Sequence, residues 1–190
     1  MTENIEVRET GLDEALRIFA DFPRSTQQKA LVGASSRAVM TARNIAWQET
    51  SKVYTVKRAD FARYTKLTTR RLMSESIGFG LRAVANLVPL ERYKHSGGRK
   101  GKKLSVEVIR GYETEMKDMF VANLGRGYGD AILERTTPKR ESSETKFSTS
   151  GAHMLNNPLV TEGMGNAAAE TFEKRLEHEI DRILRGYGTS

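Results

Sequence analysis

The sequence contains no cysteine among its 190 residues. This absence excludes disulfide scaffolds, thiolate zinc sites, iron–sulfur clusters and cysteine nucleophiles, and it suits folding in a reducing compartment. No apolar stretch approaches the roughly 18 residues that a membrane span requires. Residues 1–8 are polar and acidic, without the basic and apolar regions of a secretory signal. We therefore expect a protein that is made and folded in the cytosol and has no membrane partner.

Patterns that indicate catalysis or metal binding are also missing. The histidines are scattered and lack the spacing of a metal motif such as H-E-x-x-H. Only three residues separate Gly97 from Gly101, where a P-loop has four, and residues 125–129 lack the spacing of a dinucleotide fingerprint. We therefore expect no enzymatic activity, cofactor or metal site. The three histidines are His95, His153 and His178.

Positive charge is concentrated in the middle of the chain. The net charge is +7, and residues 51–110 hold 15 basic but only 4 acidic residues, whereas residues 1–22 and 111–190 are net acidic. A localised field of this sign can meet nucleic-acid phosphates or the acidic end of another copy of the chain, and charge alone leaves both open. The candidate electrostatic contact residues are Arg70, Arg71, Arg99, Lys100, Lys102 and Lys103.

A long helix is predicted from about residue 26 to 50, after a capping box formed by Ser25 and Gln28. It carries alanines at strict four-residue spacing, with Trp47 near its end. Small side chains in such a row let another backbone approach closely, so we expect tight packing on a sheet or a second helix. Ordinary core packing is the favoured interpretation, and a subunit interface is the alternative. The row consists of Ala30, Ala34, Ala38, Ala42 and Ala46.

Shorter elements surround this helix. Apolar periodicity predicts a short helix over residues 12–22, and residues 57–64 are expected to form one or two helical turns. A basic hairpin with a charged tip is predicted at about 90–110, because alternating apolar residues follow the glycine- and lysine-rich stretch. Strands are predicted within residues 65–88 and at 104–109, 119–124 and 131–136, the last two joined by a glycine-rich turn.

Residues 136–150 contain eight Ser or Thr among fifteen, which predicts a surface loop, mobile in the free protein, that extends to about residue 165. The clearest helical pattern follows at 166–185, and we expect this helix to pack beside the alanine-rich helix across a common sheet. The predicted fold class is α+β, in a single domain over residues 1–190. An antiparallel sheet with a long hairpin is packed by the two long helices.

The order of these elements resembles the minor tail protein Z family of long-tailed bacteriophages, whose members are tail-completion or neck proteins. The likeness covers nearly the whole chain, and Val88–Lys94, with its Pro-Leu-x-x-aromatic pattern, is its most specific part. The Ser/Thr-rich stretch 136–150 departs from the family pattern. The other similar stretches are the helix 26–50 ending in Trp47–Ser51, Val106–Ile109, Met119–Leu124, Ile132–Arg135 and Phe172–Leu184.

This resemblance implies a structural virion protein that completes the head-proximal end of the tail and supports head–tail joining. It implies no catalytic residues. Related neck proteins form rings, commonly hexamers, so the partners implied are further copies of the chain and neck or tail proteins such as a tail terminator or head–tail connector. A closed ring repeats one head-to-tail interface between two different patches, which suits a chain with opposite charge in its middle and at its ends.

Two other functions stay open at this point. A non-specific DNA-binding protein would use the same cations on phosphates, although the sequence lacks zinc-finger ligands and a recognition helix for base readout. A tail enzyme such as a wall hydrolase would need a pair of converging acids, and the carboxylates here lie mostly at helix-surface spacing.

Overall fold

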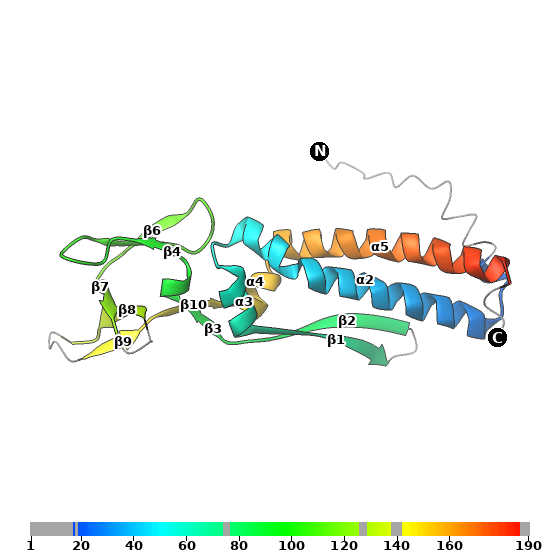
Figure 1. The fold of residues 1–190 in the computed structure, drawn as a ribbon, viewed down its shortest axis with the longest axis horizontal. Coiled ribbons are helices and arrows are strands. Elements are labelled where there is room, and N and C mark those ends of the chain that lie inside the picture. The colour runs from blue at the N-terminus through cyan, green and yellow to red at the C-terminus, as the bar shows by residue number, and fades with distance from the viewer. Residues whose placement is uncertain (1–16, 18, 74–76, 126–128, 138–141, 187–190) are drawn as a thin grey trace. The chain divides into compact units, whose positions relative to one another are not determined.

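The computed structural model describes residues 17, 19–73, 77–125, 129–137 and 142–186. It contains two long helices, three short helical segments and ten strands in this part of the chain (Figure 1). The predicted short helix at 12–22 falls mostly outside the described residues. The helical segments are α2 (Arg24–Val53), α3 (Arg58–Tyr64), η1 (Leu90–Arg92), α4 (Gly151–Leu155) and α5 (Pro158–Leu184).

The strands form four small antiparallel sheets, which confirms the α+β class. Two sheets have two strands, β1–β2 and β10–β3, and two have three strands, β4–β5–β6 and β7–β8–β9. The strands are β1 (Thr65–Met73), β2 (Ile77–Ala85), β3 (Leu87–Pro89), β4 (Lys94–Ser96), β5 (Leu104–Glu107), β6 (Glu113–Met116), β7 (Met119–Asn123), β8 (Asp130–Arg135), β9 (Ser143–Thr145) and β10 (Phe147–Ser150).

The chain, which the sequence analysis treated as one domain, divides into two compact units. Unit 1 consists of residues 1–43, 69–81 and 165–190, and unit 2 consists of residues 44–68 and 82–164. The helices α2 and α5 and the strands β1 and β2 contribute residues to both units. Each unit is described below by itself.

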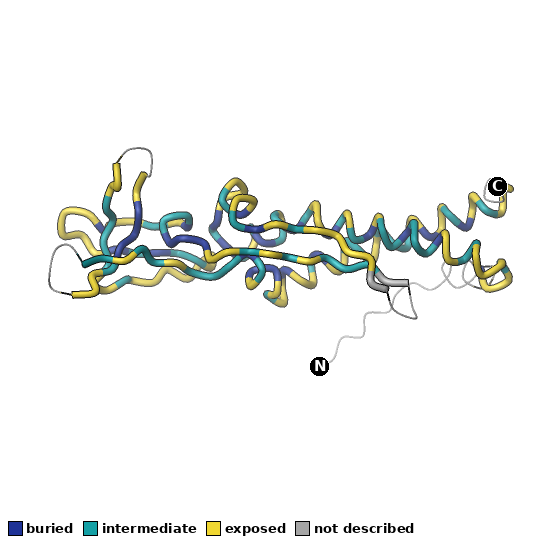
Figure 2. Tube along the Cα trace, turned by 90° about the horizontal axis from the view of Figure 1, so that it is seen from below, coloured by how far each residue is buried: buried dark blue, intermediate teal, exposed yellow. Residues whose placement is uncertain are grey.

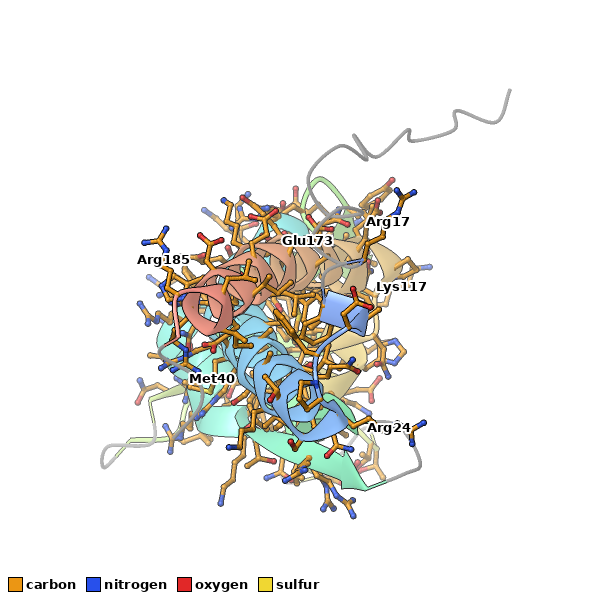
Figure 3. The ribbon with its side chains drawn as sticks, turned by 90° about the vertical axis from the view of Figure 1, so that its right-hand side faces the viewer. Arg17, Arg24, Met40, Lys117, Glu173 and Arg185 are labelled. Atoms are coloured by element: carbon orange, nitrogen blue, oxygen red, sulfur yellow. The ribbon has the colours of Figure 1, made fainter. Side chains whose placement is uncertain are left out.

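Unit 1 is built on a direct contact between α2 and α5. Leu176 and Ile180 of α5 pack against Ala30 and Ala34 of α2 in one buried cluster that Phe19 completes. The small alanine side chains allow close approach of the two helices, and the dark bands along them in Figure 2 mark these buried turns. The predicted pairing of these helices is confirmed, but in unit 1 they touch each other directly, where we expected a common sheet. The end of the β1–β2 hairpin lies beside α2 (Figures 1 and 3).

The core of unit 2 forms around the segment Val88–Lys94. Val88, Leu90 and Tyr93 of this segment are all buried, and the Tyr93 hydroxyl donates a hydrogen bond to the Thr149 carbonyl at 3.1 Å. Burial raises the pKa of the Tyr93 hydroxyl well above its ordinary value. The segment therefore fastens β3 and η1 to β10, almost sixty residues further along the chain. Further buried side chains come from the neighbouring sheets: Leu104, Val106, Ala131, Ile132 and Leu133.

Two glycines of unit 2 mark places where helices and strands approach closely. A Cβ added at Gly151, the first residue of α4, would lie 1.8 Å from Thr65 Oγ1. A Cβ at Gly163 of α5 would lie 2.2 Å from Glu49 Oε2 of α2. The short Thr65 side chain leaves no room for a Cβ at Gly151, so glycine is required there by packing, whereas the Glu49 carboxylate beside Gly163 is the end of a flexible side chain that can move.

Several predicted elements are confirmed. The long helix and the turns at 57–64 correspond to α2 and α3, and strands occupy most of residues 65–88. The basic hairpin corresponds to β4 and β5, which pair with Ser96 opposite Ser105. The strands predicted at 119–124 and 131–136 correspond to β7 and β8, paired with Val121 opposite Ile132.

The predicted loop at 136–165 is wrong over most of residues 143–165, where the structure places β9, β10, α4 and the first two turns of α5. Residues 138–141 of the predicted loop lie outside the described residues. The Ser/Thr-rich residues form strands because their backbones complete existing sheets: Thr145 pairs with Leu133, and Phe147 pairs with Pro89. The last helix begins at Pro158 instead of 166, and the Asn157 side chain caps it by accepting a hydrogen bond from the Leu159 N–H at 3.1 Å.

Candidate functional site

The glycine-rich loop at residues 97–103 is a built turn in unit 2. Gly97, Gly98, Lys100 and Gly101 all adopt positive φ, which for the lysine is an unfavourable conformation. The Gly98 carbonyl accepts a hydrogen bond from the Val121 N–H at 2.8 Å, which ties the loop to β7. A Cβ at Gly98 would lie 2.8 Å from Val121 Cγ2, so the loop also packs closely on that strand.

Half of the positive charge predicted for this loop is neutralised within unit 2. The Arg99 guanidinium lies 2.5 Å from Asp130 Oδ1, and the Lys103 ammonium lies 2.7 Å from Glu115 Oε1. Lys100 and Lys102 are exposed and have no ion pair among the described residues. The loop therefore presents two free cations, where the sequence suggested four.

The neighbouring strand β4 carries a further neutralised cation. The Lys94 ammonium donates a hydrogen bond to the Glu107 carboxylate across the β4–β5 pair. This bond raises the pKa of Lys94 and lowers the pKa of Glu107, whose carboxylate also accepts a hydrogen bond from the Gly111 N–H. The charge at the base of the hairpin is thus internally balanced.

The other two predicted contact residues, Arg70 and Arg71, belong to unit 1 and therefore do not share a unit with the loop. Both are exposed on β1 and have no ion pair in the part of the chain that the structure describes. Their positive charges are therefore available to an external partner.

The alanine row is buried inside the chain. Ala30, Ala34, Ala38, Ala42 and Ala46 are all buried, and the first two contact α5. This burial supports core packing over a subunit interface. Trp47 is half-buried, and the Arg58 guanidinium lies 5.7 Å from the centroid of its ring, within the range of a cation–π contact.

Unit 2 exposes several large apolar side chains that sequence reasoning missed. Leu87 on β3 is 56% exposed, and Phe147 on the paired strand β10 is 51% exposed. Phe147 pairs with Pro89 and Leu87 pairs with Ser150, with a register irregularity between the two pairs, so the two exposed side chains lie on paired neighbouring strands. The pattern signal was hidden, because Phe147 stands alone among Ser and Thr. The remaining exposed apolar residues of unit 2 are Val84, Ile109, Tyr112, Leu124 and Leu159.

A polar cleft of about 340 Å³ lies between α3, η1 and β4 in unit 2. Arg92 stands 3.7 Å from Asp60 and 3.9 Å from Glu91, distances that allow ion pairing but not hydrogen bonding. The two mostly buried carboxylates thus lie around one guanidinium. The cleft is lined by Thr55, Lys57, Asp60, Glu91, Arg92, Tyr93, Lys94 and His95.

The histidines lie in different settings. His95 Nδ1 is 2.9 Å from the Tyr93 carbonyl, the backbone N–H of His153 donates to the Ser150 hydroxyl in the cap of α4, and His178 lies on the exposed side of α5. Among the described residues, no three His, Cys, Asp or Glu side chains gather in a way that could hold a metal ion.

Within the described ranges, no helix is both long enough and apolar enough to cross a membrane. Comparison of the chain with protein-family models, with curated proteins and with solved structures finds no match.

Proposed function

We propose that the chain is a structural, non-enzymatic protein of the phage virion, which completes the head-proximal end of the tail and supports head–tail joining. The observation that carries the proposal is the uncovered apolar surface of unit 2, centred on Leu87 and Phe147. The phage assignment itself comes from the resemblance of the sequence to the minor tail protein Z family.

This apolar surface supports docking onto another protein. Large apolar side chains on neighbouring strands lose contact with water only when a partner covers them, and burial of apolar area contributes about 25 cal/mol per Å². Leu87 and Phe147 lie on the two paired strands of one sheet, β3 and β10.

Unit 2 also exposes charged residues of both signs. Protein interfaces combine an apolar centre with a charged, solvent-accessible border. The loop lysines Lys100 and Lys102 supply positive charge without an ion pair among the described residues, whereas β6 exposes the acidic Glu113. Because unit 2 carries both signs, one copy of the chain could contact another through two different patches, as a ring requires. We propose a ring, commonly a hexamer in related neck proteins, with a tail terminator or head–tail connector as the neighbouring partner.

A double variant, Leu87→Ser with Phe147→Ser, tests the proposal. Both side chains are more than half exposed, so the fold should persist while association is lost. Native mass spectrometry of the purified protein should show oligomers for the wild type and monomers for the variant, and the variant should not be incorporated into purified tails.

The matched control removes two exposed apolar side chains from unit 1, Met40→Ser with Leu184→Ser, and should leave association unchanged. Circular dichroism confirms that each variant is folded. Normal incorporation of the folded Leu87/Phe147 variant into tails would refute the docking role of this surface.

A further inference from the structure

The unit 1 part of α2 carries charge of one sign. The part of α2 that belongs to unit 1, residues 24–43, contains four basic residues and no acidic one. The unit 1 part of β1 adds Arg70 and Arg71. None of the six side chains has an ion pair among the described residues, although all of them are exposed. The four basic residues of α2 are Arg24, Lys29, Arg37 and Arg43.

The neighbouring helix α5 shows that this pattern is not a general property of the unit. Its acids and bases are matched within one or two turns, as in the pairs Lys174–Glu170 and Arg182–Glu179. In the end-on view of Figure 3, Arg24 and Met40 project outward from α2, as Glu173 does from α5. Like charges without a counter-charge repel each other, and a negatively charged partner relieves this repulsion.

We propose that this cationic surface of unit 1 binds the phosphate backbone of duplex DNA. With about 100° of rotation per residue, Lys29, Arg37 and Arg43 fall within an arc of about 120° on the side of α2 away from Ala38. They extend over about 21 Å at 1.5 Å per residue. A linear array of this length fits an extended polyanion better than a small anion, and duplex DNA presents about one charge per 1.7 Å.

The composition of the surface favours DNA over an acidic protein. Specific protein interfaces bury an apolar centre. On α2 between residues 24 and 43, Met40 is the only large apolar side chain among the described residues that is classed as exposed, and it is just 38% exposed. Phosphate contacts need only positive charge, and they carry no sequence information by themselves. We therefore expect binding that is independent of base sequence and strongly dependent on salt.

Fluorescence anisotropy with a labelled duplex of arbitrary sequence tests the proposal over a range of salt concentrations. If about five phosphates are contacted, the plot of log K against log salt should have a slope of about −4.5. The triple variant Lys29→Gln, Arg37→Gln, Arg43→Gln should bind at least about tenfold more weakly at low salt, with a slope nearer zero by about 2.7.

The control has the same net charge but loses three exposed cations from unit 2: Lys100→Gln, Lys102→Gln, Lys117→Gln. It should keep the wild-type slope. An equal loss of binding in both variants, or an unchanged slope in the unit 1 variant, overturns the proposal. So does polyglutamate that displaces DNA at equal charge concentration, since that result assigns the surface to an acidic protein. Incorporation into tails is a separate readout, so failure of DNA binding and failure of the assembly role can be told apart.

Discussion

The cores of the two units are built differently. Unit 1 brings two helices together through small residues, and its outer surface on α2 is charged with one sign. Unit 2 buries larger side chains, such as Leu104 and Ile132, between small sheets, and it leaves other large apolar side chains uncovered. Close helix contact needs small side chains, whereas short strands from distant parts of the sequence need large ones to fill the space between sheets.

The difference extends to what each unit offers to a partner. The exposed cations in the unit 1 part of α2 have no ion pair among the described residues, whereas Arg99, Lys103 and Lys94 of unit 2 are each matched by a carboxylate. Conversely, among the side chains whose burial the structure describes, unit 1 exposes two large apolar ones, Met40 and Leu184, and unit 2 exposes seven. Surfaces of the first kind attract polyanions, and those of the second kind bury area against proteins. The comparison predicts how substitutions in each unit should behave.

The largest effect is expected from a truncation in the core of unit 2. Ile132→Ala removes a fully buried side chain from β8 and leaves a cavity, which should lower the free energy of unfolding by about 2–5 kcal/mol. Urea denaturation followed by circular dichroism measures it. The control Ile109→Ala removes the same atoms from a side chain that is 39% exposed and should cost clearly less. Equal losses would mean that unit 2 does not depend on large buried side chains.

In unit 1 we expect an enlarged side chain, and not a truncated one, to be destabilising. Ala34→Leu inserts a larger side chain where α2 meets Leu176 and Ile180, and the strain should cost about 1–3 kcal/mol. The same substitution at the exposed Ala169 of α5 should be nearly neutral. Thermal melts of the two variants measure this difference in stability. A higher melting temperature for Ala34→Leu than for the wild type would show that the contact between α2 and α5 contains unfilled space.

The sequence predicted the elements whose signals are local. The four-residue alanine spacing predicted α2 and its burial, and alternating apolar residues predicted β5. It did not predict β9 and β10, because their stability comes from pairing with β8 and β3 and not from their own Ser- and Thr-rich composition. The early start of α5 had a usable signal, since Asn157 before Pro158 is a favourable cap and first helical residue.

The candidate surfaces were predicted less completely, since ion pairs between distant residues cannot be read from charge counts. The sequence marked Arg99 and Lys103 as free contacts, but Asp130 and Glu115 neutralise them from strands β8 and β6. It attributed the basic character to residues 51–110, whereas the unpaired cations of unit 1 also include those of α2. A net charge of +3 over residues 23–50 gave only a weak indication of that surface.

A third prediction concerns the glycine-rich loop at residues 97–103, which packs on β7 in unit 2. Gly98→Ala and Gly101→Ala both force alanine to positive φ, which costs about 1–2 kcal/mol. At Gly98 the added Cβ also lies 2.8 Å from Val121, whereas at Gly101 nothing lies within 4 Å. Gly98→Ala should therefore be the more destabilising of the two in thermal melts. If the two variants have the same melting temperature, the packing of the loop against β7 does not contribute to stability.

The smallest effect should distinguish the ion pairs of the two units by pH. Hydrogen bonds from Lys94 and from the Gly111 N–H lower the pKa of Glu107 below 4.5, so this carboxylate stabilises the fold above that pH and loses the contribution as the pH falls through its lowered pKa. Glu107→Gln should lower the melting temperature at neutral pH and leave it unchanged in strong acid. Glu170→Gln in unit 1 breaks an ion pair within one helix, where Lys174 is the only partner that lowers the pKa of the Glu170 carboxyl. The melting temperature of this variant should therefore differ even less from that of the wild type. Melting temperatures are measured from strong acid to neutral pH. If Glu107→Gln keeps the pH dependence of the wild type, the ion pair with Lys94 contributes nothing to the stability of unit 2.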